Sequence, residues 1–333
     1  VEGLTQAEVN PPDLVVVDVM MPRMTGYEFC RQARTKPALE EVPIIMFSAR
    51  FQPVDRQTAL DAGATDYLSK TTSPNELLHR ISGMLPATVT TTTQTTLGLF
   101  SLRGGTGLTS LAVNVAVNLA TTKKQPTALV DLARLGGHTA LMMGLRPTSS
   151  VSQVLNGTKN DLTPDALKPH LIGHSSGVQL LASGYGYDHQ LQYNDKRLGQ
   201  LVTTLKSTFA YTIFDVPHIL EPSLVPTLQL FDKIGMVISP DTPSLQSTAM
   251  ALQVLTRLGI PNDKIVLIVN NIISTNAIPP ETIQKVVKLP ILTTIPYEPE
   301  MIKAVNSGSP LITTSPNSPG AVAIAKLTTA LVD

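Results

Sequence analysis

The first residues that could do chemistry form a glycine-rich run between two apolar stretches. Residues 97–102 are mostly apolar and predict a strand, and residues 111–119 predict a helix. Backbone N–H groups in a loop of this kind surround a phosphate at a helix N-terminus, where the helix dipole favours negative charge. The run therefore predicts a phosphate-binding loop, with residues Arg103, Gly104, Gly105, Thr106, Gly107, Leu108, Thr109 and Ser110.

The elements that must position this loop fall into two predicted domains. The chain has 333 residues, which is more than a single hydrophobic core usually holds. A Thr-rich stretch over 86–96 has almost no apolar residues and predicts a linker. We therefore expect one domain over 1–85 and a second over 97–333, and strands alternate with helices in both, which indicates parallel sheets.

The second domain contains seven short β-branched or apolar runs that predict strands. In open parallel sheets, the ligand site forms at the carboxyl ends of the strands. The residues that directly follow the runs are therefore the candidates for a site. The runs are 97–100, 127–130, 178–181, 211–214, 234–238, 265–269 and 291–295.

The composition restricts the class of protein. Hydrophobic residues make up 42% and charged residues 15%, which favours packed domains over disorder. No run reaches the roughly 20 apolar residues that cross a bilayer, and the N-terminus lacks a signal-peptide pattern, so we expect a cytoplasmic protein without membrane insertion. Lys plus Arg equal Asp plus Glu at 25 each, so no nucleic-acid partner is predicted. Cys30 is the only cysteine and excludes an internal disulfide.

The first domain carries three polar residues after predicted strands. Asp18 is followed by Pro22 and Gly26, Ser48 follows residues 44–47, and Lys70 follows residues 67–69. This pattern resembles the receiver domain of bacterial response regulators, which has a flavodoxin-like α/β fold. The resemblance implies that Asp18 is the phosphoacceptor, with Ser48 and Lys70 contacting the phosphate.

The sequence departs from the receiver pattern at its start. The family's first strand carries an acidic pair that holds Mg²⁺, and residues 1–9 resemble the end of the second helix instead. We therefore expect a truncated receiver in this chain. Two interpretations stay open: phosphorylation of Asp18 in the intact protein, and a domain that serves only for docking.

The glycine-rich run resembles the deviant Walker A loop of the ParA/MinD group of P-loop NTPases. That pattern reads Lys-Gly-Gly-x-Gly-Lys-Thr-Thr/Ser, and here Arg103 and Leu108 replace its two lysines. The resemblance covers 97–333 and implies a P-loop NTPase fold with a mostly parallel sheet. An apolar side chain removes a charge-assisted phosphate contact of roughly 1.5–3 kcal/mol.

The resemblance also implies ligands for ATP or ADP and for Mg²⁺. Asp131 is kept, but Ala133 replaces the aspartate that orients water in MinD-like enzymes. Thr109, Asp131 and Asp215 are the expected ligands if Mg²⁺ is bound, and Asn270 matches the residue that reads adenine. No residue is assigned a catalytic role, and we expect no ATPase activity or a very slow one.

Both domains together are most similar to the CpaE/TadZ family, which positions tight-adherence pilus machinery in bacteria. This resemblance implies a homodimeric scaffold at the cell pole or the inner face of the membrane, with pilus or secretion proteins and a sensor kinase as partners. Three alternatives stay open: an active ParA/MinD-type partitioning ATPase, a phosphorylation-gated response regulator, and a fold that binds no nucleotide.

Overall fold

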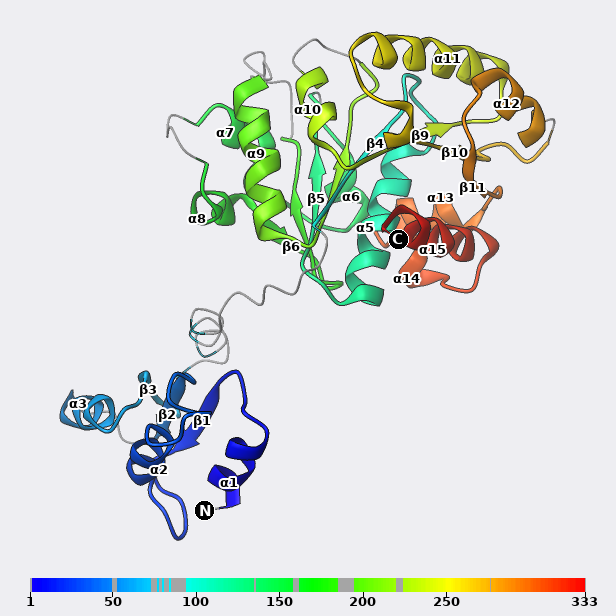
Figure 1. The fold of residues 1–333 in the computed structure, drawn as a ribbon. Helices are drawn as coiled ribbons and strands as arrows, with labels where there is room; N and C mark the ends of the chain where they lie inside the picture. The colour runs from blue at the N-terminus through cyan, green and yellow to red at the C-terminus, as the bar shows by residue number, and fades with distance from the viewer. Residues whose placement is uncertain are drawn as a thin grey trace. The chain divides into compact units, whose positions relative to one another are not determined.

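The computed structural model describes residues 2–49, 53–72, 77, 80, 84, 94–134, 136–157, 162–184, 195–219, 224–275 and 277–332. The chain divides into two compact units, Val1–Thr92 and Thr93–Asp333, and each is an α/β unit in its own right (Figure 1).

The first unit is a parallel three-stranded sheet with the strand order β1-β2-β3. Its strands are β1 (Val15–Asp18), β2 (Ile44–Ser48) and β3 (Asp66–Ser69), and its helices are α1 (Glu2–Val9), α2 (Gly26–Ala33) and α3 (Pro53–Asp61). Helix α2 begins at a capping box, because the Thr25 hydroxyl accepts the Glu28 amide while the Glu28 carboxylate accepts the Thr25 amide. Cys30 is fully buried in the core beneath this helix.

The second unit is built on an eight-stranded sheet with the order β11-β10-β9-β4-β8-β5-β7-β6. Seven strands run parallel and β6 pairs antiparallel with β7. Strands β4 and β8 are central and almost fully buried, as expected for a sheet covered on both faces. The strands are β4 (Thr95–Phe100), β5 (Thr127–Asp131), β6 (Ile172–Gly173), β7 (Val178–Leu181), β8 (Tyr211–Asp215), β9 (Lys233–Ile238), β10 (Ile265–Asn270) and β11 (Ile291–Ile295).

Helices cover both faces of this sheet and enclose two apolar cores (Figure 1). On one face lie α7 (Val151–Leu155), α8 (Pro164–Leu167), α9 (Asp195–Thr208), α10 (Val225–Leu230), α11 (Thr242–Arg257) and α12 (Pro280–Val287). On the other lie α5 (Leu108–Lys123), α6 (Thr139–Met142), α13 (Glu300–Ser307), α14 (Leu311–Thr314) and α15 (Pro319–Val332). Two short 3-10 turns, η1 (Lys168–His170) and η3 (Asn262–Lys264), complete the unit.

The predicted α/β fold class is confirmed, and all seven predicted strands of the second unit are present. The sequence did not predict β6, whose two residues are too few to show a period. Most of the predicted linker and of the predicted helix near residues 75–85 lies outside the described residues. Thr95 and Thr96, assigned to the linker, instead begin β4, because they pair in register with Tyr211 and Thr212 of β8. The Thr96 amide and hydroxyl also donate to Asp232 Oδ2, at 2.8 and 2.7 Å.

Candidate functional site: a phosphate-binding loop and a pair of buried aspartates

The glycine-rich loop connects β4 to the N-terminus of α5. Gly105 and Gly107 have φ values of 77° and 76°, a left-handed backbone that glycine adopts most readily. A Cβ atom at Gly107 would lie 2.5 Å from Nδ2 of Asn270, so glycine is also required sterically. Because β4 lies where the strand order reverses, the loop occupies the position at which ligands bind in open α/β sheets.

Asn270 holds this loop in place from the end of β10. Its side-chain Nδ2 donates to the backbone oxygen of Thr106 at 2.8 Å. The structure therefore gives Asn270 a contact with the loop itself, in addition to the base contact that the sequence predicted. Asn270 also lines a cavity of about 240 Å³ beside the loop, together with Ile272, Tyr297 and Met301.

Thr106 carries a buried polar atom without a partner. The side chain is 1% exposed, and its Oγ1 has no hydrogen-bond partner among the residues that the structure describes. Buried hydroxyls are nearly always satisfied in proteins, so an orphan at this point needs an explanation. Thr212, Thr227 and Ser239 also carry buried hydroxyls without a partner among the described residues, and the Thr106 Oγ1 has almost no exposed surface, so this atom does not by itself identify a ligand.

Leu108 is the first residue of α5 and stands at the lysine position of the resembled motif. It is half-buried and packs against the core between the sheet and α5. The side chain therefore contributes to packing and offers no charge to a ligand. Arg103 is the single cationic residue in the loop sequence 101–110.

Arg103 is engaged by an acid of the same chain. Its guanidinium forms an ion pair with Asp241, the N-cap residue of α11, which also accepts the amide of Ser244 at 2.9 Å. Burial alone would raise the pKa of Asp241, but the hydrogen bond from Ser244 and the charge of Arg103 contribute to holding it below its usual value. The sequence analysis assigned no role to Asp241, although an Asp before Thr-Pro is a typical signal for the start of a helix.

The two aspartates predicted as metal ligands are neighbours in the sheet. Asp131 and Asp215 end the adjacent strands β5 and β8, are paired in register, and are 1% and 6% exposed. Burial raises the pKa of Asp215 to about 8, the charge of Asp131 adds to this, and a hydrogen bond with the Thr109 side chain opposes it. The structure therefore brings Thr109 and both carboxylates together.

Asp131 is fixed by donors that the sequence did not identify. Its carboxylate accepts the Thr139 hydroxyl at 2.7 Å and the Ala133 amide at 3.0 Å, while burial raises its pKa. A Cβ atom at Gly137 would lie 2.0 Å from Oδ2 of Asp131, so only glycine fits. The Gly136-Gly137 dipeptide was the sequence signal for this close approach.

The first unit places its three predicted site residues at one end of its sheet. Asp18 ends β1, Ser48 ends β2 and is 5% exposed, and Lys70 directly follows β3. The Lys70 ammonium forms an ion pair with the Asp18 carboxylate. The Lys70 backbone amide donates to the backbone carbonyl oxygen of Ser48 at 2.7 Å. The hydrogen bond from Lys70, followed by that from the Met20 amide, holds the pKa of Asp18 below its usual value.

Two absences apply to the described parts of the chain. There, no three His, Cys, Asp or Glu side chains gather in a way that could hold a metal ion. Every helix in these parts is also too short or too polar to pass through a bilayer.

The first unit matches a known family. Residues 1–82 match the family model described as response regulator receiver domain. A probable transcriptional regulator, ycf27, of Cyanophora paradoxa is 43% identical over 95 residues, and response regulator MprA of a Mycobacterium species (strain KMS) is 46% identical over 88 residues. These matches cover 28% and 26% of this chain, and the chain spans only 38% and 37% of the length of these relatives.

The second unit is similar to solved structures. MinD of Pyrococcus horikoshii, solved with Mg-ADP, has a TM-score of 0.62 at 24% identity over 70% of this chain and 94% of its own. A ParA family ATPase of Chlorobium tepidum has a TM-score of 0.66 at 22% identity, over 72% and 98%. The MinC:MinD complex of Aquifex aeolicus gives 0.60 at 20% identity, over 71% and 95%.

These likenesses apply to different parts of the chain. The first unit is therefore a response regulator receiver domain, and the second has the fold of the ParA and MinD ATPases.

Proposed function

We propose that the second unit is a nucleotide-binding scaffold that hydrolyses ATP very slowly or not at all. One observation carries this proposal: a phosphate-binding loop keeps its glycine geometry while Leu108, at the position of the lysine, packs into the core. Binding depends largely on backbone N–H groups and the helix N-terminus, which remain. Hydrolysis depends on charge that stabilises the transition state, which Leu108 does not provide.

The residues present fit a nucleotide with Mg²⁺. The cavity of about 240 Å³ beside the loop offers the aromatic ring of Tyr297 and the side chain of Met301 to a base. Asp131 and Asp215 would hold Mg²⁺ with Thr109, an oxygen donor set that suits this ion. The metal would neutralise phosphate oxygens. Its charge would also relieve the repulsion between the two buried carboxylates.

Two further features support slow hydrolysis. Ala133 stands where the resembled enzymes place a water-orienting aspartate, and its methyl group cannot accept a proton or a hydrogen bond. Arg103, the cation nearest in sequence to the glycines, is already paired with Asp241. Nucleotide in this site would therefore act as a structural ligand that favours one conformation or a homodimer.

For the biological role, we propose that the protein positions or assembles a bacterial surface machine, such as a tight-adherence pilus. The support is the order of the two units, a receiver domain followed by a ParA/MinD fold, which is similar to the CpaE/TadZ arrangement. Pilus or secretion proteins would be the partners, at the cell pole or the inner face of the membrane. MinD of Aquifex aeolicus was solved in complex with MinC, so this fold does carry protein partners.

A second function is favoured by a specific observation in the first unit. Asp18, Ser48 and Lys70 lie at one end of the sheet, with Lys70 already paired to Asp18. We propose that a sensor kinase phosphorylates Asp18 and that the added charge regulates the scaffold. Treatment of the protein with beryllofluoride would then change its oligomeric state, and an unchanged state would count against regulation.

Calorimetric titration with ATP and ADP, with and without Mg²⁺, tests the main proposal. We expect saturable binding that strengthens with Mg²⁺, together with phosphate release far below that of the Leu108→Lys, Ala133→Asp double variant. Absence of binding would identify a fold without nucleotide. Parent turnover equal to that of the double variant would indicate an active partitioning ATPase.

A further inference from the structure

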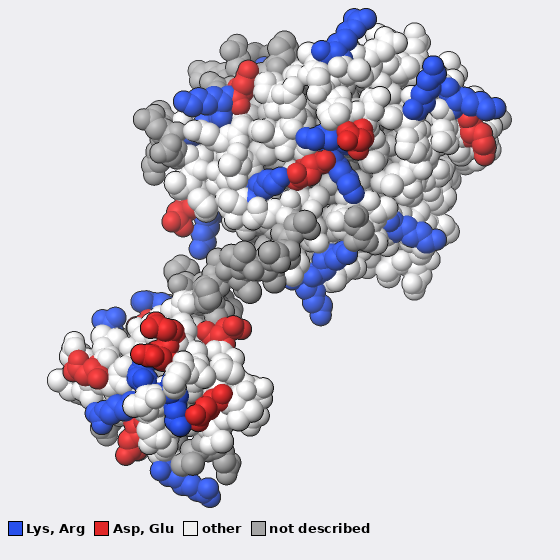
Figure 2. All heavy atoms as spheres, in the orientation of Figure 1, with Lys and Arg blue, Asp and Glu red and all other residues white. Residues whose placement is uncertain are grey.

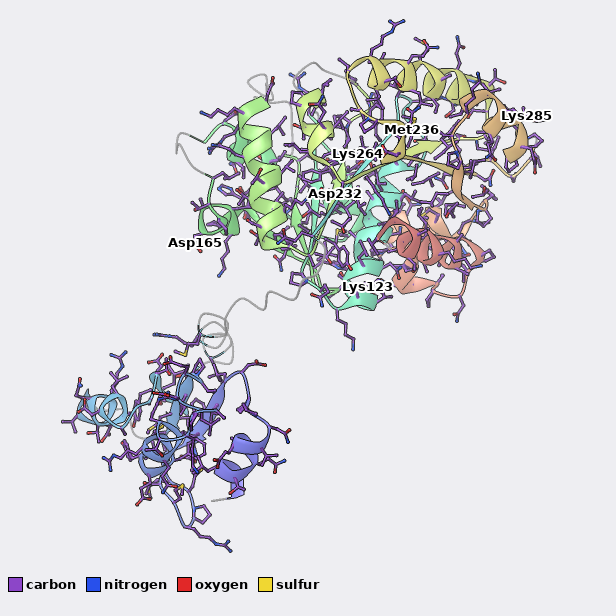
Figure 3. All side chains as sticks on the ribbon, in the orientation of Figure 1. Lys123, Asp165, Asp232, Met236, Lys264 and Lys285 are labelled. Atoms are coloured by element: carbon purple, nitrogen blue, oxygen red, sulfur yellow. The ribbon has the colours of Figure 1, made fainter. Side chains whose placement is uncertain are left out.

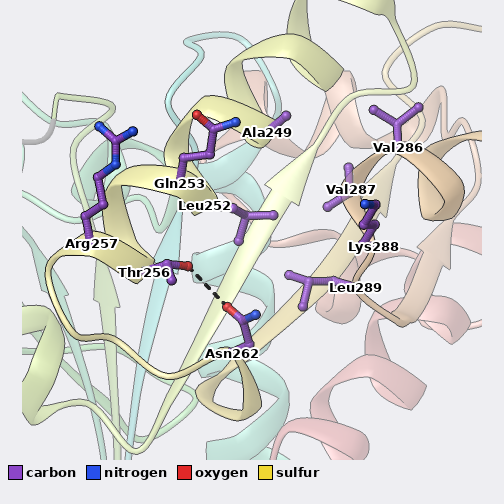
Figure 4. Close-up of a pocket in the computed structure, with 10 residues that line it drawn as sticks. All are labelled: Ala249, Leu252, Gln253, Thr256, Arg257, Asn262, Val286, Val287, Lys288 and Leu289. Carbon is purple, nitrogen blue, oxygen red and sulfur yellow. Dashed lines mark hydrogen bonds between the residues drawn. The ribbon is translucent and has the colours of Figure 1, made fainter.

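The second unit has a groove away from the phosphate-binding loop, between the C-terminal half of α11 and the end of α12 (Figure 4). Its volume is about 480 Å³. Residues from both helices and from η3 line it: Ala249, Leu252, Gln253, Thr256, Arg257, Asn262, Val286, Val287, Lys288 and Leu289. The residues assigned to the nucleotide site contribute none of these side chains.

The floor of the groove is apolar. Val287 and Leu289 are each 6% exposed, and Leu252 is half-buried against the core. In Figure 4, the Leu252 and Leu289 side chains point toward the middle of the groove. Val286 at the rim is 50% exposed, which leaves an apolar side chain in water where a partner could cover it.

The charges that line the groove are both positive. Arg257 ends α11 and Lys288 follows α12, and they lie on opposite sides of the groove in Figure 4. No acidic residue lines the groove, and α11 carries no charged residue from Thr242 to Thr256. Glu281 in the first turn of α12, and Asp263 and Lys264 in η3, are charged but are not among the residues that line the groove.

Lys288 occupies an unusual backbone conformation for a lysine. Its φ is 57°, in the left-handed region where glycine or asparagine is more common at the end of a helix. A lysine here places a cation beside the groove at some conformational cost. The dipole of α12 favours a cation at this end of the helix. The charge of Lys288 is therefore compatible with an acidic partner.

We propose that this groove binds an amphipathic helix of a partner protein, with an apolar stripe flanked by acidic side chains. Ala249 to Arg257 spans about two helical turns, roughly 12 Å, which matches two turns of a docked helix. Side chains of α11, of α12 and of the residues that follow α12 make up most of the lining, so we expect recognition through side chains in a groove. Arg257 and Lys288 attract acidic groups on both flanks.

Two other macromolecular partners fit the groove less well. The floor residues Val287 and Leu289 are recessed, so a flat bilayer surface would not reach them. Nucleic acid requires many phosphate contacts, whereas two cations line the groove. On the face shown in Figure 2, coloured side chains of both signs are scattered rather than gathered into one basic surface.

The test is a display selection of helix-biased 16-residue peptides on the full chain, followed by fluorescence anisotropy with the enriched peptides. We expect enriched sequences with apolar residues at helical spacing and an excess of Asp and Glu. The Arg257→Glu, Lys288→Asp double variant should weaken their binding by about tenfold or more, because each attraction becomes a repulsion. Aspartate at 288 tolerates the left-handed backbone.

Lys285→Glu is the matched control. Lys285 lies on α12, three residues before Lys288, and is labelled in Figure 3. It is not among the residues that line the groove. We expect this variant to bind the enriched peptides within about twofold of the parent, because an exposed charge outside the lining contributes little. Circular dichroism should show all three proteins folded, because the changed side chains are exposed.

Three results would overturn the proposal. One is enrichment without an acidic excess, and another is equal weakening by the double variant and by Lys285→Glu. The third is binding of phosphatidylglycerol vesicles, or self-association in light scattering, that the double variant abolishes while peptide binding is absent. The third result would assign the groove to a membrane or to a second copy of the chain. None of the three measurements depends on nucleotide binding.

Discussion

Replacing Leu108 with lysine tests the proposed function most directly. Leu108 is half-buried at the start of α5 and packs against the core. Full burial of leucine contributes about 1.5–3 kcal/mol, so half-burial contributes about 1 kcal/mol. The methylene stem of lysine retains part of this contact. We therefore expect Leu108→Lys to lower the melting temperature of the nucleotide-free second unit by no more than about 2–4 °C.

Leu108→Lys should increase the affinity of the second unit for nucleotide. A charge-assisted hydrogen bond from an ammonium group to phosphate contributes about 1.5–3 kcal/mol, which corresponds to about 10- to 150-fold tighter binding. The increase in affinity should be at the lower end of this range while Arg103 stays paired with Asp241, because the guanidinium then adds no phosphate contact of its own. ADP and ATP should both gain, and ATP should gain more because it carries the additional phosphate.

Calorimetry of the parent, Leu108→Lys and Leu108→Met measures this difference. Methionine has nearly the volume of leucine and no charge, so Leu108→Met should bind nucleotide like the parent. The reasoning is refuted if methionine produces the same gain as lysine, since packing would then be the cause. It is also refuted if Leu108→Lys is folded and binds ATP no more tightly than the parent.

Three further predictions concern the charged pairs. Asp241→Asn keeps the helix cap but frees Arg103, so ADP affinity by calorimetry should rise about two- to fivefold; a fall would contradict this. Lys70→Gln should raise the pKa of Asp18 toward the ordinary carboxyl value in an NMR titration. An unchanged pKa would show that Lys70 does not stabilise the Asp18 carboxylate. For Asp232, burial raises the pKa, but hydrogen bonds from Lys206 and Thr96 outweigh it and lower the pKa. Its stabilisation is therefore present above the unfolded-state pKa and lost as the pH falls through the lower folded-state pKa. In urea titrations, Asp232→Asn should reduce the free energy of unfolding at pH 7 and match the parent in acid; equal reductions at both pH values would be evidence against this linkage.

The framework of both units was predictable because parallel strands leave local signals. Runs such as residues 127–130 and 211–214 are mostly β-branched or apolar, and an aspartate directly follows each. The rule that ligands lie at the carboxyl ends of parallel strands then placed Asp131 and Asp215 at one site. The structure places them in adjacent strands in register. The sequence contained this information because strand periodicity and the chemistry at strand ends are both local.

The contacts that shape the loop could not be predicted in the same way. Arg103 and Asp241 are 138 residues apart, and Asn270 lies 164 residues from Thr106. No spacing rule connects such pairs, because their contact depends on the order of β4, β9 and β10 in the sheet. The orphan hydroxyl of Thr106 was invisible for the same reason, since burial is a property of the folded loop.

The arrangement around the loop explains why binding and hydrolysis can be separated in this fold. Asn270 holds the loop backbone and the core holds Leu108, so the glycine conformation does not depend on a lysine. Backbone N–H groups contact phosphate oxygens in the ground state and in the transition state alike, and such uniform contacts favour binding without accelerating reaction. An ammonium at position 108 would add the interaction that grows as charge develops. Under the proposed function, a leucine at this position reduces catalysis more than affinity, and a bound nucleotide would stabilise one conformation instead of driving a cycle.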